Sequence, residues 1–303
     1  AGQVQTSVRA TQEAIMAKSM PPMRLTALLF LSLLWMDVSS AVEVCKVVDL
    51  QLVTQTGEFF LAVSFLIMGV TTVAFVLMAF KAAHEKRKFY FIMCYVTAIS
   101  TFAYYAMLSG QGWLITPNCR QLFYVRYVDW FFTTSLIFLN LGLIVGADTG
   151  LNIAIIAADM LMIFGGFMAS ISSGHIKWLW FSLSLLIFAP LVYTMLRGYR
   201  ALVDRSNPSV VEMYSKVAWI AAITWGLYPL VFIFSEGTGD WSPNFEIMIY
   251  AVLDIMSKVV FGFVLLLSHD GLDRITNFKS FAPIREAPSY GTQMTKAPVE
   301  SYI

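Results

Sequence analysis

Long apolar runs dominate the chain and are separated by short polar connections. Each run has about 20 residues or more, which is the length that an α-helix needs to cross the hydrocarbon core of a bilayer. This pattern predicts an all-α membrane protein, a bundle of seven transmembrane helices in which sequence neighbours are also neighbours in space. The predicted spans are residues 58–80, 89–109, 121–145, 151–171, 177–197, 212–235 and 246–268.

Lysine and arginine are distributed unevenly among the connections, and this asymmetry predicts the orientation. Connections rich in these residues face the cytoplasm. The second connection has only Arg120 and the sixth has none, so both are expected outside. With seven spans, the N-terminus is then outside and the C-terminus cytoplasmic, in a multi-pass protein expected in the plasma membrane. The positive residues of the first and fifth connections, and of the start of the next span, are Lys81, Lys86, Arg87, Lys88, Arg197, Arg200, Arg205 and Lys216.

The composition supports a membrane protein and excludes several other classes. Hydrophobic residues make up 58% of the 303 residues and charged residues 13%, against about 45–50% and 25% in a soluble domain. The net charge of +1, with no basic tract, gives no reason to expect a nucleic-acid partner. No metal-ligand spacing of Cys and His is found, and no glycine-rich phosphate loop, so neither a metal site nor enzymatic activity is expected.

Residues 1–57 and 271–303 differ in composition from the helical domain at 58–270. Within the N-terminal extension, residues 23–41 combine a basic residue, an apolar run of about 12 residues and small residues near the end, which is typical of a cleaved signal peptide. The alternative is a retained helix lying on the outer membrane surface. The C-terminal segment is polar and rich in Pro and Ser, so a disordered cytoplasmic tail is expected.

Two of the three cysteines, Cys45 and Cys119, fall on the predicted outer side, where disulfides persist. They could bridge each other, or Cys45 could pair with another chain. Cys94 lies within the second span, where a cysteine commonly serves as a small buried hydrophobe.

Ionisable residues inside apolar spans are costly and are therefore functional candidates. Asp254 and Lys258 are four residues apart in the last span and share one helix face. They could form a purely structural ion pair. Alternatively, Lys258 could lose its proton and form a Schiff base with an aldehyde.

The third span carries a polar column on one face, because Arg126, Asp129, Thr133 and Asn140 keep helical phase. Together with the acid and the cation of the last span, Arg126 and Asp129 would form a group of two anions and two cations. Its charges sum to zero, as burial in a low-dielectric medium favours.

Aromatic residues are concentrated in the sixth span, which reads "WGLYPLVF" at residues 225–232. Such spacing is usual for a helix core, and Pro229 should kink the helix. With Trp130 and Trp180 on other spans, these rings could also form a flat apolar slot for a long conjugated ligand.

Three segments, "RYVDWFFTT", "WGLYP" and "LDIMSKVVFG", resemble the microbial rhodopsins, the retinal proteins typified by bacteriorhodopsin. The similarity covers about residues 58–270 in the same order and spacing, "AADMLMIFGG" and "SEG" also match, and fungal and algal members look most similar. The resemblance implies a light-activated protein with all-trans-retinal bound covalently to Lys258. Its partners would be membrane lipid, protons and further copies of the chain in a homo-oligomer.

The resemblance also implies roles for polar residues. Asp129 would be the counterion and first proton acceptor, with Asp254 as the second anion. Arg126 would gate the outward path, and Asp159 would stay protonated because burial disfavours its charged form. The remaining polar roles are a hydrogen bond from Thr133 to Asp129, hydrogen bonds of Tyr104 and Tyr228 around Asp254, a pair of Asp159 with Thr134, and proton release by Glu236 and Glu246.

The wall of the retinal pocket is implied in the same way. Three tryptophans would sandwich the polyene and smaller groups would complete the wall. These residues are Trp130, Trp180 and Trp225, with Thr134, Met162, Tyr228, Pro229 and Phe232.

The cytoplasmic half departs from the proton pumps of this family. Asn140 stands where pumps carry the carboxylate that donates a proton, Met93 replaces a hydroxyl residue of bacteriorhodopsin, and Ser135 replaces a proline. An outward proton pump with slow reprotonation directly from the cytoplasm is therefore expected. The alternatives are a photosensor with little transport and a light-gated channel, although the second span lacks the glutamates of many cation channels.

Overall fold

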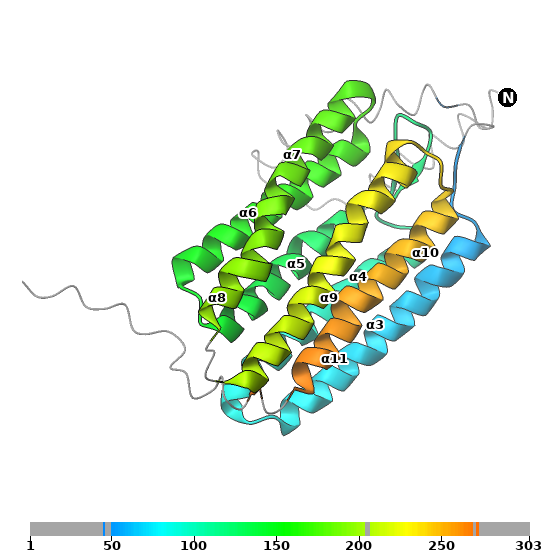
Figure 1. The fold of residues 1–303 in the computed structure, drawn as a ribbon. Coiled ribbons are helices and arrows are strands. Elements are labelled where there is room, and N and C mark those ends of the chain that lie inside the picture. The colour runs from blue at the N-terminus through cyan, green and yellow to red at the C-terminus, as the bar shows by residue number, and fades with distance from the viewer. Residues whose placement is uncertain (1–44, 46–49, 204–206, 269–270, 273–303) are drawn as a thin grey trace, which may run out of the picture.

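The computed structural model describes residues 45, 50–203, 207–268 and 271–272 (Figure 1). The signal-like segment at 23–41 lies outside the described residues, and so does the tail from residue 273 onward. The domain limits expected at 57 and 270 therefore stay predictions.

Seven helical rods in the described chain are long and apolar enough to cross a membrane, which confirms the predicted fold class. Sequence neighbours pack side by side, and the last rod packs against α3, so the bundle closes on itself (Figure 1). The main helices are α3 (Gln55–Lys81), α4 (Arg87–Leu108), α5 (Tyr124–Val145), α6 (Thr149–Ile171), α7 (Gly174–Tyr193), α9 (Pro208–Phe232), α10 (Pro243–Asp254) and α11 (Phe261–Leu266).

Short helical segments extend or join several of these helices. A 3₁₀ turn, η2 (His84–Lys86), precedes α4. The π-helical η3 (Thr194–Tyr199) and the short α8 (Arg200–Leu202) continue α7, and η4 (Ile233–Gly237) continues α9. A third π-helical segment, η5 (Ile255–Val260), joins α10 to α11 and contains Lys258. Single π turns inside α-helices often occur at functional sites.

Local sequence signals account for several helix ends. The side chain of Asp148 caps α6 by accepting a hydrogen bond from the backbone N–H of Gly150 at 2.8 Å. Ser242 caps α10 in the same way, and Pro243 follows it at the first helical position, where a missing N–H costs nothing. Gly146 ends α5 with a φ of 65°, a left-handed conformation that glycine adopts without strain.

A two-stranded hairpin between α4 and α5 corrects the predicted start of the third span. Strands β1 (Leu114–Ile115) and β2 (Gln121–Leu122) pair antiparallel, so the helix begins at Tyr124 and not at residue 121. Gln51 lies beside β2, donating its N–H to the carbonyl of Cys119 and accepting from the N–H of Gln121, both at 2.9 Å. Cys45 and Cys119 form a disulfide with each other. Of the two pairings that the sequence left open, the structure therefore has the bridge within the chain. We call this end of the bundle the hairpin end.

A close approach of α5 and α6 depends on Gly142. A Cβ built there would overlap Oδ1 of Asn152 and lie 2.7 Å from its Cγ. Asn152 cannot easily turn away, because it is buried and its Oδ1 accepts a hydrogen bond from Tyr199 at 2.6 Å.

We therefore expect Gly142→Ala to destabilise the bundle by about 1–3 kcal/mol, the usual cost of overpacking. The measurement is the thermal unfolding midpoint in detergent. Gly226→Ala in α9 is the matched control, since its Cβ would meet no atom within 4 Å of those described. Equal midpoints for the two variants would contradict the prediction.

Candidate functional site

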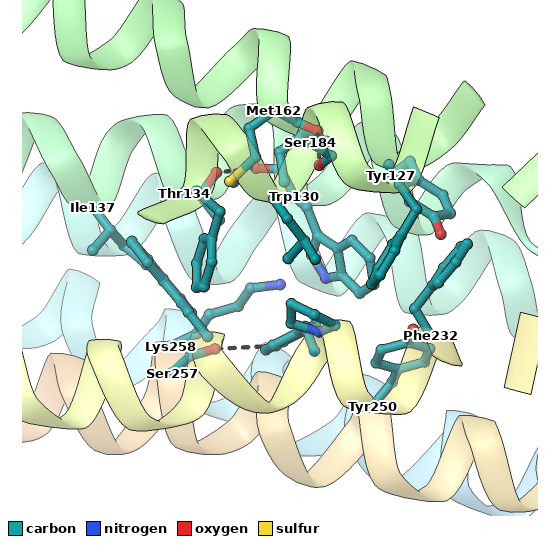
Figure 2. Close-up of a pocket in the computed structure, with 18 residues that line it drawn as sticks. Tyr127, Trp130, Thr134, Ile137, Met162, Ser184, Phe232, Tyr250, Ser257 and Lys258 are labelled. Atoms are coloured by element: carbon teal, nitrogen blue, oxygen red, sulfur yellow. Dashed lines mark hydrogen bonds between the residues drawn. The ribbon is translucent and has the colours of Figure 1, made fainter. Parts of the chain in front are cut away.

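An apolar cavity lies in the middle of the bundle, between α5, α6 and α7 on one side and α9, α10 and η5 on the other (Figure 2). The side chain of Lys258 extends into it toward Trp130. The lining residues are Tyr127, Trp130, Thr134, Ile137, Met162, Ile163, Gly166, Phe181, Ser184, Leu185, Phe188, Trp225, Tyr228, Pro229, Phe232, Tyr250, Ser257 and Lys258.

Most of the predicted wall lies on this cavity, but Trp180 does not. Its neighbour Phe181 takes that place and stacks on Phe232, with ring centroids 4.8 Å apart and planes 7° apart. Trp180 is only partly buried and meets Phe164 edge-on at 6.2 Å. Consecutive residues of a helix point about 100° apart, so an error of one position moves a side chain off the wall.

Lys258 forms ion pairs with two buried carboxylates. Its Nζ lies 2.5 Å from Oδ2 of Asp129 and 3.2 Å from Oδ1 of Asp254. All three side chains are at most 2% exposed. Asp129 and Asp254 therefore converge on the lysine from different helices, α5 and α10, as the resemblance implies.

Asp254 is held by three neutral donors as well as by the lysine. Tyr104 donates to Oδ2 at 2.7 Å, while Tyr228 and Nε1 of Trp130 donate to Oδ1 at 2.6 and 3.1 Å. Tyr104 and Tyr228 thus lie where the resemblance places them, although Tyr104 does not line the cavity.

The predicted hydrogen bond of Thr133 to Asp129 is present, but it reaches the backbone and not the carboxylate. Thr133 donates at 2.8 Å to the backbone carbonyl of Asp129, one turn earlier in the same helix, as Thr commonly does. The carboxylate itself accepts from Ser100 of α4, at 2.7 Å to Oδ1. The sequence contains no signal that singles out Ser100 for this contact, because Thr97 and Thr101 of the same span also carry hydroxyls.

Arg126 points away from Lys258, which corrects the expected neutral group of four. Its Nη1 lies 2.7 Å from Oε1 of Glu246 and 4.0 Å from Oε1 of Glu236, and its guanidinium carbon is 4.4 Å from the centre of the Tyr250 ring. Arg120, which was predicted only as a loop cation, is 4% exposed and pairs with Glu246 at 2.6 Å. These buried ion pairs therefore form two groups, one around Lys258 and one at the hairpin end.

Asp159 is completely buried and accepts hydrogen bonds from Thr134 at 2.6 Å and from Ser135 at 3.0 Å, both on Oδ2. The pair with Thr134 is the one the resemblance implies. Ser135, the residue found in place of a proline, adds a second donor from the same helix.

Asn140 lies toward the other end of the bundle, completely buried. Its Nδ2 is 3.5 Å from the carbonyl of Phe89, and no donor among the described residues reaches its Oδ1. Met93 is buried in the apolar cluster nearby, which also contains Phe89. In the described part of the chain, this half offers Lys258 no carboxylate comparable to Asp129.

The arrangement suits a long apolar aldehyde. Aromatic rings wall the cavity, Lys258 supplies an amine that can condense with a carbonyl, and two carboxylates stand ready to balance a cation on that nitrogen. Asp129 is also close enough to take a proton from the nitrogen directly.

Comparison with known proteins identifies the family. A family model described as bacteriorhodopsin-like protein matches residues 55–272. Opsin-1 of Neurospora crassa is 30% identical over 241 residues, which are 73% of this chain and 79% of the relative. Bacteriorhodopsin of Halobacterium salinarum is 31% identical over 214 residues, which are 69% of this chain and 82% of the relative.

Solved structures agree with this assignment. A light-driven proton pump from Leptosphaeria maculans superposes with a TM-score of 0.71 at 26% identity, covering 75% of this chain and 98% of that one. The light-driven proton pump of Coccomyxa subellipsoidea gives 0.70 at 31% identity, covering 73% and 100%. The chain therefore belongs to the bacteriorhodopsin-like family of microbial, type 1 rhodopsins.

Proposed function

We propose that the protein is a light-driven outward proton pump that carries all-trans-retinal on Lys258. The observation that carries the proposal is the contact of 2.5 Å between Lys258 and Asp129, a donor and an acceptor for one proton. Members of the family bind retinal through a lysine Schiff base, and two structural relatives are described as light-driven proton pumps.

The residues of the cavity fit this cofactor. Trp130 and Trp225, on α5 and α9, would hold the polyene with Phe181 and Phe232, and Met162 would complete the wall. When bound, retinal supplies the light absorption and the isomerisation that lower the proton affinity of the Lys258 nitrogen.

The residues of this chain then determine where the proton goes. Asp129 takes it from the Lys258 nitrogen, whereas both carboxylate oxygens of Asp254 already accept hydrogen bonds, from Tyr104, Tyr228 and Trp130. Neutralising Asp129 changes the field at Arg126, one turn away on α5, and so links the transfer to Glu236 and Glu246 at the hairpin end.

The direction of transport depends on the orientation, in which the hairpin end faces outside. Two observations support it. The connections at the opposite end are rich in Lys and Arg, and the disulfide lies at the hairpin end, where an oxidising compartment would preserve it. The plasma membrane is the proposed location, and a homo-oligomer the proposed assembly.

A sensory photoreceptor is the second candidate, and Asn140 favours it. An amide cannot donate a proton near neutral pH, so return of the proton to Lys258 must be slow. A long-lived light state is what a sensor needs and what a pump avoids.

Voltage-clamp photocurrents distinguish these functions. We expect an outward current of one sign at all potentials, because a pump is driven by light and not by the gradient. A current that reverses with the ion gradient would indicate a channel, and no current would indicate a sensor.

Lys258→Ala should abolish visible absorption after retinal is added, because the amine that would bind retinal is lost. Lys216→Ala, which removes the cation of an exposed ion pair, should keep the absorption. A coloured Lys258→Ala protein would contradict retinal attachment at Lys258.

Recovery of the dark absorbance after a flash should be slow and should speed up in proportion to the proton concentration, because the proton comes directly from the cytoplasmic solution. Asn140→Asp should make recovery faster and less dependent on pH, since a carboxyl group can donate. Asn140→Leu is the control and should keep the pH dependence. A pH-independent recovery in the unmodified protein would be inconsistent with the absence of a donor.

Ser100→Ala should accelerate proton transfer to Asp129, because the carboxylate loses a hydrogen bond that stabilises its charge. Such a bond contributes about 1.5–3 kcal/mol. If about half of this energy affects the transition state, proton transfer measured by flash photolysis should become roughly four- to twelvefold faster. Thr133→Val is the matched control, since among the described residues this hydroxyl donates to a backbone carbonyl and not to the carboxylate. A larger effect of Thr133→Val than of Ser100→Ala would reverse the assignment.

A further inference from the structure

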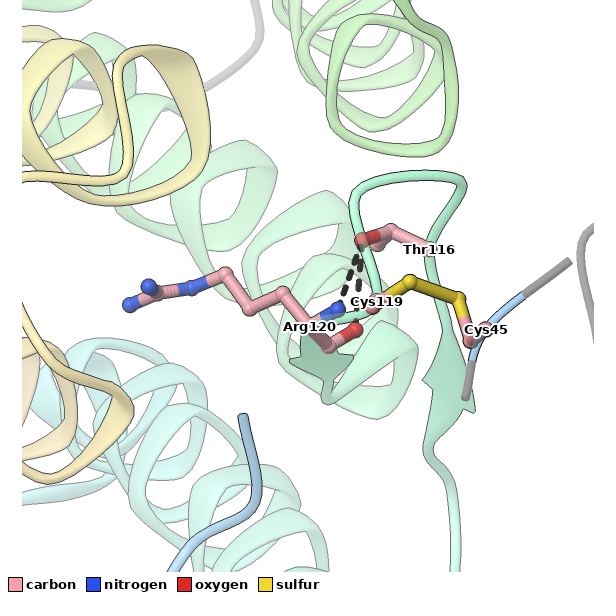
Figure 3. Close-up of a disulfide and its surroundings, with 4 residues drawn as sticks. All are labelled: Cys45, Thr116, Cys119 and Arg120. Atoms are coloured by element: carbon pink, nitrogen blue, oxygen red, sulfur yellow. Dashed lines mark hydrogen bonds between the residues drawn. A yellow bond between two sulfur atoms is a disulfide. The ribbon is translucent and has the colours of Figure 1, made fainter. Parts of the chain in front are cut away.

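Arg120 lies at the centre of a set of contacts that close the hairpin end. It follows Cys119, whose disulfide to Cys45 ties the N-terminal segment to the hairpin (Figure 3). Its backbone carbonyl accepts hydrogen bonds from the N–H and the hydroxyl of Thr116 across the turn, at 2.9 and 3.2 Å. With Gln51 paired to the backbone on both sides of it, Arg120 has little freedom to move. We call Cys45, Gln51 and Cys119, which surround the backbone of Arg120, the outer clamp.

The guanidinium of Arg120 makes four hydrogen bonds while 4% exposed. Its Nε and Nη2 both donate to Oε2 of Glu246, at 3.1 and 2.6 Å. Its Nη1 donates to Oε1 of Gln51 at 3.1 Å and to the carbonyl of Trp241 at 2.8 Å. The same side chain therefore joins the N-terminal segment, the hairpin and the start of α10.

The two carboxylates at this end have unequal surroundings. Glu246 accepts three hydrogen bonds from two guanidiniums, because Arg126 takes its other oxygen at 2.7 Å. Glu236 accepts one hydrogen bond, from Tyr127 at 2.8 Å. No donor among the described residues bonds its Oε1, which is 4.0 Å from Arg126 and buried.

We propose that Arg120 is a positioning residue, held by the outer clamp, that keeps Glu246 an anion and leaves Glu236 as the outer carboxylate that exchanges the proton. The proposal rests on the proposed pump function and goes beyond it, since the family resemblance treats the two carboxylates alike. Two guanidiniums on one carboxylate are a strong barrier to its protonation, because both buried ion pairs, with Arg120 and Arg126, would be lost.

The groups that face Glu236 are consistent with this role. Tyr127 and Arg126 of α5 approach its carboxylate, and Tyr250 of α10 lies beneath Arg126. Lys177 of α7 donates to the backbone carbonyl of Glu236 and not to its carboxylate. Among the described residues, the cation paired with the Glu236 carboxylate is Arg126, at 4.0 Å. Because Arg126 is already bonded to Glu246 at 2.7 Å, Glu236 can change its charge without breaking a close ion pair.

Infrared difference spectra between light and dark would test the assignment, because a protonated carboxyl group has its own carbonyl stretch. Besides the band expected from Asp129, one band from the outer carboxylates should change in the light. Glu236→Asp should shift that outer band, and Glu246→Asp should leave it in place. Arg120→Gln should add a second band, which Glu246→Asp then shifts. Arg120→Lys keeps the positive charge and should add none. A band that moves with Glu246→Asp and not with Glu236→Asp would overturn the proposal.

A second measurement uses the protein without retinal, so that it does not depend on the pump function. If Arg120 holds the clamp closed, Arg120→Gln should increase the rate at which a mild thiol reduces the Cys45–Cys119 disulfide several-fold. The rate is measured by alkylation of the freed cysteines. Lys216→Gln, which removes an exposed cation of an ion pair, should not. Unchanged reduction in Arg120→Gln would overturn the clamp, whereas failure to form any pigment would refute only the proposed function.

Discussion

A buried lysine between two buried carboxylates is the interaction on which the rest of the structure depends. Lys258, Asp129 and Asp254 lie in the middle of an apolar bundle, and leaving any one of these charges unpaired would cost about 3–5 kcal/mol. With one cation and two anions, the group needs further donors. Tyr104, Tyr228, Trp130 and Ser100 supply them, and they come from three different helices. The arrangement of α4, α5, α9 and α10 is therefore tied to the chemistry of one amine.

The separation of the charges into two groups gives the site a direction. Arg126 and Asp129 are one turn apart on α5, but Arg126 bonds the carboxylates of the hairpin end while Asp129 bonds Lys258. A change of charge on Asp129 can therefore be felt by Arg126 without a direct contact between them. The other half of the bundle has no equivalent group in the described chain, because Asn140 is neutral and meets the carbonyl of Phe89, a residue of an apolar cluster. Among the described residues, the buried charges that flank Lys258 therefore extend toward the hairpin end and not toward Asn140.

The hairpin end shows how a connection can become part of a site. A single arginine reaches the carboxylate at the start of α10 because a disulfide, a two-stranded hairpin and the backbone of Gln51 hold its main chain in place. Because these contacts already order the backbone, the ion pair of Arg120 does not have to offset the conformational entropy of a free loop. This is why Arg120 can make four hydrogen bonds where an arginine on a free loop would be solvated.

The sequence by itself determined the seven spans, the pairing of Lys258 with an acid one turn away, and the family, because apolar run length and helical phase are local properties. Contacts between helices are not local, and only the tertiary structure decided them. It selected Ser100 over Thr133 as the donor to the Asp129 carboxylate, turned Arg126 toward Glu246, and buried Arg120. It also placed Phe181 on the cavity wall in place of Trp180, since a shift of one residue rotates a side chain by about 100°. Which face of a helix meets which neighbour depends on packing across the whole bundle, and no spacing within one span records it.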